Sequence, residues 1–394
     1  MIKHIFKILW NERKKYSGLL VEQILVFIIL LVSVISIFDA VKKYTEPGLL
    51  DTENRVVIGY MLKNNGRNLD LKEQQNIAKS MDVILDNLRG EPFVEAITES
   101  FGFTPYMRMD SDYAQISDSV KIDGKTVLAV IKTADKETEQ VFNPSLEEGS
   151  WFTSEKLEDG TYPAILTRQL VDKLGWEKAV GRKLNMKHTF TVIGVIAGVK
   201  QEVFSISPPS IIVGKGVLFN LLYFRECCAK IKPGYKSEFF NKFNYEFQRL
   251  SLNTNAILMY FDMEDLKKSS MSDVVSDIAM QVIPTLFLLF FTFIGTLGLS
   301  LLNSKKRKIE FATRLVVGST KCDLLFLVFW ENLILTIFAS LPGIVLALFV
   351  YEWTIVHAIA FVITFLIMIL FSMFSAWYPA YRVSRLNPVD AMRE

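Results

Sequence analysis

Four long apolar stretches constrain this chain more than any other feature of its sequence. Each contains about 20 or more residues with almost no charge, enough for a helix to cross the roughly 30 Å of a bilayer's hydrocarbon core. Buried helices of soluble proteins are usually shorter. The sequence therefore predicts four transmembrane helices. The stretches are Leu19 to Phe38, Ile278 to Leu302, Leu324 to Val350 and Ile355 to Trp377.

The spacing of these stretches predicts a large domain between the first and second transmembrane helices. The first stretch has a basic flank like that of a signal peptide, but it is longer and no A-x-A site follows it before Asp39, so we expect it to remain as a helix. The expected boundaries are an amphipathic N-terminal segment at 1–16, helices at 17–38, 277–302, 323–350 and 354–378, the large domain with its stalk at 39–276, a coupling loop or helix at 303–322 and a C-terminal tail at 379–394.

The charges flanking the apolar stretches predict their direction across the membrane. Residues 1–16 carry five Lys/Arg and one Glu, residues 303–321 carry six and one, and residues 379–394 carry three Arg against Asp390 and Glu394. These segments sum to +10, which leaves −8 on the rest of a chain whose net charge is +2. Short loops rich in Lys and Arg stay in the cytoplasm. We therefore expect both termini and the 303–321 loop to be cytoplasmic and the large domain to be extracytoplasmic.

The large domain carries both helical and strand patterns. Alternating β-branched residues favour strands, a spacing of three to four favours helices, and Asp123-Gly124 is a turn signal. The domain is therefore expected to be α+β. The predicted segments are strands at Arg55 to Leu62, Phe93 to Thr98 and Ala256 to Phe261, helices at Leu71 to Leu88 and Tyr235 to Leu250, hairpin-rich parts at Tyr113 to Ile131 and Lys183 to Val199, and a helical lead-in at Asp262 to Ser276.

The sequence offers little catalytic chemistry. His4, His188 and His357 have no metal ligand or base at motif spacing. Ser119 to Thr126 ends like a phosphate loop but lacks the first Gly and lies in the predicted hairpin. Cys227 and Cys228 fit either two small buried apolar residues or a vicinal disulfide, and we assign them no function. We expect no catalytic residue, no metal site and no cofactor bound by this chain.

Several residues inside the predicted spans have both a functional and a structural interpretation. Glu331 lies about seven residues into the third span, where it either makes a polar contact within the bundle or with the basic loop, or is accommodated at the interface. His357 is a proton-sensing group or a structural residue. Pro342-Gly343 predicts a kink, with a hinge as the functional alternative. Gly295 and Gly298 lack the spacing of a G-x-x-x-G dimerisation motif but allow close packing.

A basic segment, Lys305 to Gly318, directly follows the second span and ends in a glycine, as a short surface helix does. The preference for Lys and Arg in cytoplasmic loops explains the lysines of this segment. It does not explain why Glu310, Arg314 and Gly318 follow one another at intervals of four residues. The segment resembles the coupling loop of MacB/FtsX-type ABC permeases, in which a basic stretch leads into R-E-I-G-I-R-x-x-x-G. The resemblance implies ATPase coupling by Lys308, Glu310, Arg314 and Gly318, and a family position at Glu331.

The C-terminal segment also resembles this family, whose chains end in P-A-x-x-A-x-x-x-x-P-x-x-A-L-R. Looser likenesses occur at Asn11 to Lys15, Glu148 to Phe152 and Val180 to Val195. The sequence departs from the family pattern at Ile309, where the family has Arg, and at Ala312, where it has Gly. The matching C-terminal residues are Pro379, Ala380, Arg382, Pro388, Ala391 and Arg393.

The resemblance implies a stand-alone permease of the bacterial inner membrane, which transmits motion from a partner ATPase to a periplasmic domain. The chain has no complete Walker A motif, so ATP and Mg²⁺ are expected on a separate ABC ATPase dimer. Other implied partners are a second permease chain, identical or homologous, membrane lipids, and a periplasmic adaptor or an outer-membrane or envelope protein; no nucleic acid is expected. The alternative is a membrane-anchored sensor or adaptor whose external domain binds a ligand or protein without ATP coupling.

Overall fold

The computed structural model describes residues 13–63, 70–107, 116–122, 125–215, 217, 225–250, 252, 255–351 and 354–384, without the side chains of 13–15, 71, 116–122, 125, 380 and 382–384. It divides into a helical unit, Met1–Lys42 with Val275–Glu394, and an external unit, Lys43–Val274. Several sequence predictions concern residues outside the description: His4, Asn11-Glu12, the Asp123-Gly124 turn, and Pro388, Ala391 and Arg393.

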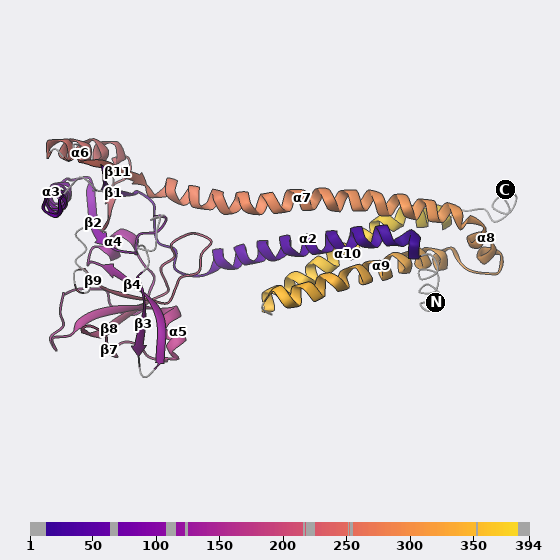
Figure 1. Cartoon of the computed structure of the whole chain (residues 1–394), viewed down its shortest axis with the longest axis horizontal. Coiled ribbons are helices and arrows are strands. Elements are labelled where there is room, and N and C mark those ends of the chain that lie inside the picture. Colours follow the sequence, from indigo (N-terminus) through magenta and orange to yellow (C-terminus); the bar gives the residue numbers. More distant parts are fainter. Residues whose placement is uncertain are drawn as a thin grey trace. The chain divides into compact units, whose positions relative to one another are not determined.

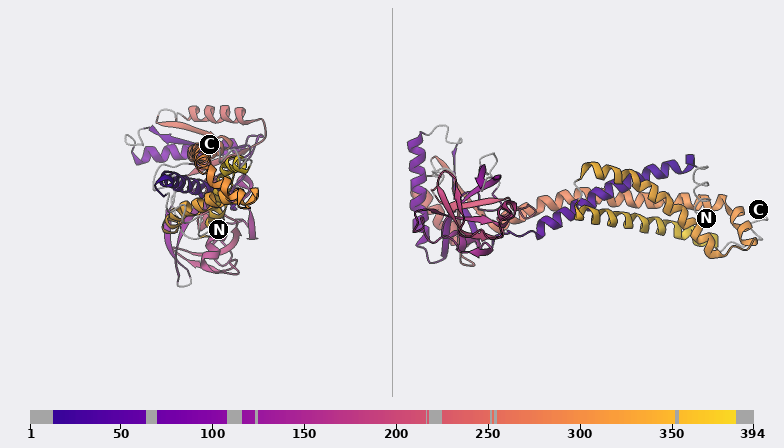
Figure 2. Two further views of the ribbon diagram at one scale, coloured as in Figure 1. Left: turned by 90° about the vertical axis from the view of Figure 1, so that its right-hand side faces the viewer. Right: turned by 90° about the horizontal axis from the view of Figure 1, so that it is seen from below.

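Four helices are long and apolar enough to cross a membrane, which confirms the predicted fold class. Within the helical unit they run alongside one another (Figures 1 and 2). Each extends beyond its predicted span: one begins at Met263, where the helical lead-in was expected, and the last continues into the predicted C-terminal tail as far as Ser384. The helices are α2 (Arg13–Thr45), α7 (Met263–Lys306), α9 (Lys321–Val350) and α10 (Ile355–Ser384), and the short helix α8 (Lys308–Val316) lies between α7 and α9.

Close packing and buried hydroxyls hold these helices together. The Phe27 ring of α2 fills the space left by Gly343 of α9, where an added Cβ would lie 2.5 Å from the ring. The hydroxyls of Ser33 and Thr285 lie 2.8 Å apart and join α2 to α7. α9 continues as one helix through Pro342. The Pro342-Gly343 pair therefore allows a neighbouring helix to approach closely.

The first sheet of the external unit has four antiparallel strands in the order β11-β1-β10-β2. Helices α3 and α6 cover one of its faces (Figure 1). A capping box fixes the start of α3, because the Asp70 side chain accepts from Glu73 N and Glu73 Oε2 accepts from Asp70 N. The elements are β1 (Arg55–Leu62), α3 (Leu71–Arg89), β2 (Val94–Ser100), β10 (Glu226–Ile231), α6 (Lys236–Arg249) and β11 (Ala256–Asp262).

The second sheet has seven strands and mixed directions, in the order β3-β4-β9-β6-β8-β5, with β7 paired to β8. Strands β3 and β4 form the predicted hairpin, so Ser119 to Thr126 lies in a hairpin and not in the strand-to-helix turn of a phosphate loop. The elements are β3 (Ile116–Ile122), β4 (Lys125–Ala134), α4 (Thr138–Phe142), β5 (Leu146–Gly149), β6 (Tyr162–Thr167), α5 (Arg168–Leu174), β7 (Lys183–Asn185), β8 (Thr189–Ile196) and β9 (Ser210–Gly214).

A buried carboxylate joins the two sheets. Glu226 of β10 accepts from the backbone N–H groups of Gly102, Phe103 and Thr104, at 2.9, 3.2 and 2.9 Å. Lys132 of β4, in the second sheet, donates its ammonium group to the carbonyl oxygen of Gly102. The loop after β2 is therefore held from both sheets.

Cys227 and Cys228 are both free and buried. Because successive residues of a strand face opposite sides, Cys227 packs in the core beneath α3 and α6, and Cys228 packs in the core between the sheets. Burial raises the pKa of the Cys227 thiol to about 12. The two cysteines therefore behave as small apolar residues.

Candidate functional site

The predicted coupling segment is divided between two helices. α7 continues to Lys306, and α8 begins at Lys308, with Arg307 between them. Gly318 follows the end of α8 with φ of 105°, and its N–H donates to Leu315 O at 3.2 Å. A positive φ favours glycine at this position. Gly318 therefore ends α8, and a capping box between Thr320 and Asp323 starts α9 directly afterwards.

Arg307 connects α8 to α9. Its Nε and Nη2 donate to the carboxylate of Glu310 at 2.7 and 3.1 Å, and its Nη1 donates to Glu331 Oε1 at 2.6 Å. The guanidinium also lies 5.0 Å from the ring centre of Phe311. The side chains of Arg307 and Glu331 are only 10% and 8% exposed. A planar guanidinium with several fixed donors suits such a three-way contact.

The other carboxylate of the cluster is shared with a second arginine. Glu310 Oε1 accepts from Arg314 Nη2 at 2.9 Å, one helical turn along α8. The hydrogen bonds from Arg307 lower the pKa of Glu310, although burial opposes the shift. Burial lowers the pKa of Arg307, but its bonds to Glu310 and Glu331 outweigh this and raise it above its ordinary value. Arg307 and Glu310 therefore stay charged at physiological pH.

A small polar recess adjoins this cluster. Tyr16, Asn303, Arg307, Glu331 and Asn332 are among the residues that line it. Asn303 Nδ2 donates to the hydroxyl oxygen of Tyr16 at 2.9 Å, while Asn303 Oδ1 has no hydrogen-bond partner among the described residues. The recess has room for roughly one water molecule, which would satisfy that oxygen.

The two faces of α8 differ sharply. Phe311 and Ala312 are 1% and 0% exposed, and Phe311 packs against α9 and α10. On the opposite side, Ile309, Val316 and Val317 are 63%, 63% and 82% exposed. We call these three residues the outer face of α8. An apolar surface on a short helix beside basic residues can bind a groove on another protein.

The structure brings together three of the residues selected from the sequence. Glu310, Arg314 and Glu331 form one cluster, in which Glu331 makes the contact with the basic loop that was one of its two interpretations. Lys308 is the first residue of α8, and Gly318 ends that helix. The residue that sequence reasoning missed is Arg307. Its spacing of three from Glu310 was a usable signal.

Other predicted residues lie elsewhere. Pro379 is buried within α10. The backbones of Ala380 and Arg382 also belong to α10, and their side chains are outside the description. His357 Nε2 lies 3.7 Å from Asp39 Oδ1. Within the described parts of the chain, no group of three or more His, Cys, Asp or Glu is arranged to hold a metal ion.

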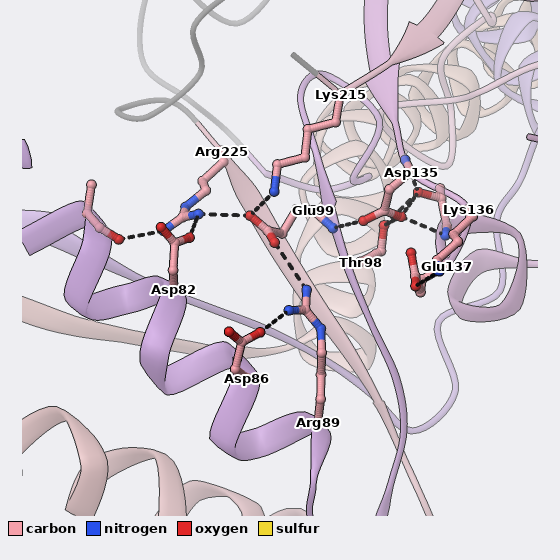
Figure 3. Close-up of polar contacts among 12 residues, drawn as sticks. Asp82, Asp86, Arg89, Thr98, Glu99, Asp135, Lys136, Glu137, Lys215 and Arg225 are labelled. Carbon is pink, nitrogen blue, oxygen red and sulfur yellow. Dashed lines mark hydrogen bonds and ion pairs between the residues drawn. The ribbon is translucent and has the colours of Figure 1, made fainter. Parts of the chain in front are cut away.

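A second charged cluster lies in the external unit (Figure 3). The carboxylate oxygens of Glu99 of β2 form ion pairs with side-chain nitrogens of Arg89, Lys215 and Arg225, at 3.1, 2.6 and 2.9 Å. Asp82 and Asp86 of α3 pair with Arg225 and Arg89, so the six charges balance. Sequence reasoning selected none of these residues. These ion pairs tie α3 to β2 through Arg89 and Arg225.

Two family models match the chain. The MacB-like periplasmic core domain matches residues 24–234, and the FtsX-like permease C-terminal model matches residues 282–388. No curated protein sequence matches.

Among solved structures, the periplasmic region of MacB from Actinobacillus actinomycetemcomitans is 14% identical, with a TM-score of 0.38, over 55% of this chain and 92% of that one. The extracellular domain of the transporter YknZ from Gram-positive bacteria is 12% identical, with a TM-score of 0.36, over 52% and 100%. A domain of a putative permease from Porphyromonas gingivalis is 13% identical, with a TM-score of 0.37, over 54% and 92%.

Proposed function

The chain belongs to the MacB/FtsX-type permease family, since one family model alone covers more than half of it, and on this premise we propose that it is the permease subunit of an ABC transporter that transmits ATPase-driven motion across the bacterial inner membrane. Permeases of this family work with ABC ATPase partners. The observation that carries the proposal is Arg307, which fastens α8 to α9 at the end of the continuous helix α7.

Force on α8 has two routes into the bundle. The ion pair between Arg307 and Glu331 connects α8 to α9, and the buried Phe311 ring packs against α9 and α10. α7 runs without interruption from Met263 to Lys306, so it transmits displacement along its axis toward the external unit. A helix is stiff over this length because its turns are hydrogen-bonded to one another, and in α7 Pro284 removes one of these bonds. The external domain is thus the receiver of the motion.

The outer face of α8 is proposed as the surface that docks onto the ATPase. Ile309, Val316 and Val317 are exposed, whereas the Glu310 carboxylate bonds to both Arg307 and Arg314. Glu310 and Arg314 then act on coupling by holding α8 in place. Lys308, selected from the sequence, places a positive charge at the start of α8. Gly318, also selected from the sequence, ends the helix.

The remaining features of the proposal follow from the family and the charge pattern. Both termini and α8 face the cytoplasm, and the external unit is periplasmic. The ATPase dimer holds ATP and Mg²⁺, so this chain is not itself the enzyme. A second permease chain, lipids, and an adaptor, outer-membrane or other envelope protein complete the expected partners.

Co-purification with separated variants tests the docking surface. A C-terminally tagged chain would be extracted in mild detergent, alongside the double variant Ile309→Asp with Val317→Asp, the single variant Arg307→Gln and the control Val180→Asp. We expect an ABC ATPase with the parent and with Val180→Asp, whose side chain is exposed in the external unit. We expect the ATPase to be lost with the double variant, because two carboxylates would enter an apolar interface.

Arg307→Gln separates docking from transmission. Because the outer face is unchanged in this variant, the ATPase should still co-purify with it. If the parent chain recovers no ATPase even after cross-linking, the proposal fails and the sensor or adaptor alternative takes its place.

A further inference from the structure

The two edge strands of the four-stranded sheet differ in how far side chains block their outward backbone groups. Strand β2 forms one edge and strand β11 forms the other. An edge strand presents unpaired backbone N–H and C=O groups, which attract a strand from another chain unless they are blocked. Comparing the two edges therefore shows where the external unit is open to strand pairing.

The β2 edge is blocked. Glu99 N donates to Asp135 Oδ2 at 2.7 Å, and Glu95 O accepts from Gln140 Nε2 at 3.4 Å. Phe101, just beyond the strand, bridges to Thr133. Figure 3 shows Asp135 beside Glu99 and Thr98. Side chains thus occupy the outward backbone positions of this edge, and its charged residues oppose further pairing.

The β11 edge has none of these protections. Residues 256–261, AILMYF, contain no charge and no proline, and their register against β1 is regular throughout. Across the described part of the chain, no side chain bonds to the outward backbone of these residues. The charge at the end of the strand, Asp262, is engaged by Lys236 at 2.5 Å.

The side chains beside this edge are apolar and uncovered. On the face turned away from α3 and α6, Ile257 and Phe261 of β11 are 48% and 41% exposed, and Met61 of β1 is 51% exposed. Val57, on the same face, is covered by the core between the sheets and is 2% exposed. The uncovered row therefore runs along the free edge and ends where the second sheet begins.

The order of residues in β11 is complementary to itself. In an antiparallel pair centred on Met259, Ile257 would lie opposite Phe261 of the second copy, and Met259 opposite its own counterpart. Leu258 would lie opposite Tyr260 of the second copy on the other face. No charge is brought against an apolar side chain within residues 257–261. A two-fold symmetric interface requires this kind of self-complementarity.

We propose that two copies of this chain pair through their β11 strands, antiparallel and centred on Met259, so that the two four-stranded sheets become one continuous eight-stranded sheet. This interface goes beyond the proposed function, and its test does not depend on recovery of an ATPase.

Disulfide cross-linking in membranes tests both the partner and the register. The full-length chain would carry Cys322→Ser, which removes the exposed thiol, while Cys227 and Cys228 are buried. Directly opposed residues in an antiparallel pair have Cβ atoms about 4.5–5.5 Å apart, close enough for a disulfide after small adjustments. We therefore expect Met259→Cys to form a covalent dimer on mild oxidation.

Ile257→Cys is the register control. It would be roughly 13 Å from its own counterpart, at about 3.3 Å per residue, and should not form a dimer by itself. When Ile257→Cys and Phe261→Cys are carried on differently tagged chains, the mixed dimer should form. If Met259→Cys lowers the amount of folded chain, the Ile257/Phe261 pair still determines the register of the two strands, because it leaves Met259 unchanged.

Tyr245→Cys controls for random collision, since Tyr245 lies on α6 and is 61% exposed. The proposal is overturned if Met259→Cys and the Ile257/Phe261 pair both cross-link no better than Tyr245→Cys. It is also overturned if Met259→Cys is captured by a different protein, because the edge would then belong to that partner.

Discussion

Two buried charged groups, one in each unit, are held in contrasting ways. Glu226 in the external unit is bound by three backbone N–H groups and the hydroxyl of Ser100. Arg307 in the helical unit is bound by side-chain carboxylates, and one of them, Glu310, is 37% exposed. Backbone partners have fixed positions, whereas long side chains change partners by rotation. Glu226 is therefore a rigid joint in the external unit, and Arg307 is an adjustable joint in the helical unit.

The largest expected effect follows from removing the rigid joint. Glu226→Ala leaves the N–H groups of residues 102–104 and the Lys132 ammonium without their carboxylate. Breaking a buried charged contact typically costs about 3–5 kcal/mol of stability. Thermal unfolding in detergent would be followed with a thiol-reactive dye in a Cys322→Ser background, so that buried Cys227 and Cys228 report on the external unit.

We expect Glu226→Ala to unfold well below the parent and Glu155→Ala, whose side chain is exposed, to match it. Equal melting temperatures for all three chains would show that Glu226 is not a structural joint.

Removing Arg307, the adjustable joint, should lower stability less than removing Glu226. Arg307 and Glu331 should also tolerate replacement of both residues together. Arg307→Met removes the 2.6 Å hydrogen bond to the buried Glu331 carboxylate, which should lower stability by about 1.5–3 kcal/mol, the usual range for hydrogen bonds to charged groups. Arg307→Met with Glu331→Met should recover most of this loss, because an apolar pair replaces a buried ion pair. Unfolding of the helical unit would be followed by circular dichroism in mixed micelles containing SDS. If the double variant is less stable than either single variant, the pair is not a replaceable link.

A pH dependence should distinguish the two joints. Burial lowers the pKa of Lys132 to about 8, although Glu226 opposes the shift. The unfolded chain then binds more protons than the folded chain between pH 8 and the ordinary lysine pKa of about 10.4, so stability rises with pH through this window and is lost as pH falls from the top of the window to about 8. From pH 7 to pH 9 the gain should be about 1 kcal/mol.

The thiol-dye measurement on parent and Lys132→Met tests this dependence. The parent should gain stability over this pH range relative to the variant, in which the titrating group is absent. Parallel pH curves for the two chains would contradict a depressed pKa at Lys132. No matching dependence is expected for Arg307, whose pKa is raised above its ordinary value.

The smallest effect is expected at the exposed end of the adjustable joint. Arg314 is 32% exposed and pairs with Glu310 one turn away on the same helix. Exposed ion pairs contribute about 0–1 kcal/mol. Arg314→Ala should therefore leave the unfolding midpoint in mixed micelles almost unchanged. A loss as large as that of Arg307→Met would mean that Arg314 supports more of the cluster than its contacts indicate.

Much of the fold could be predicted from the sequence because its signals are local. The strand predicted at Arg55 to Leu62 is β1 with the same bounds, and the polar lead-in after Asp262 is the start of α7. Length and hydropathy were sufficient for the four long helices. These patterns repeat every two or three to four residues, so a short window contains them.

The two joints could not be predicted in this way because they depend on long-range contacts. Glu226 and its loop are more than 120 residues apart in the chain. Arg307 and Glu331 are 24 residues apart. Arg307 was also hidden within a basic run that the membrane-side charge rule already explained. The order of strands, and hence the open edge at β11, likewise required the tertiary structure.

Spin labels on the external unit test whether Arg307 transmits motion from α8. Two copies labelled at Tyr245→Cys, in a Cys322→Ser background and in complex with the ATPase, would be measured by electron paramagnetic resonance with and without a non-hydrolysable ATP analogue. We expect the distance between the labels to change in the parent and to stay the same in Arg307→Gln, although the ATPase stays bound. The same distance change in both chains would contradict transmission through Arg307.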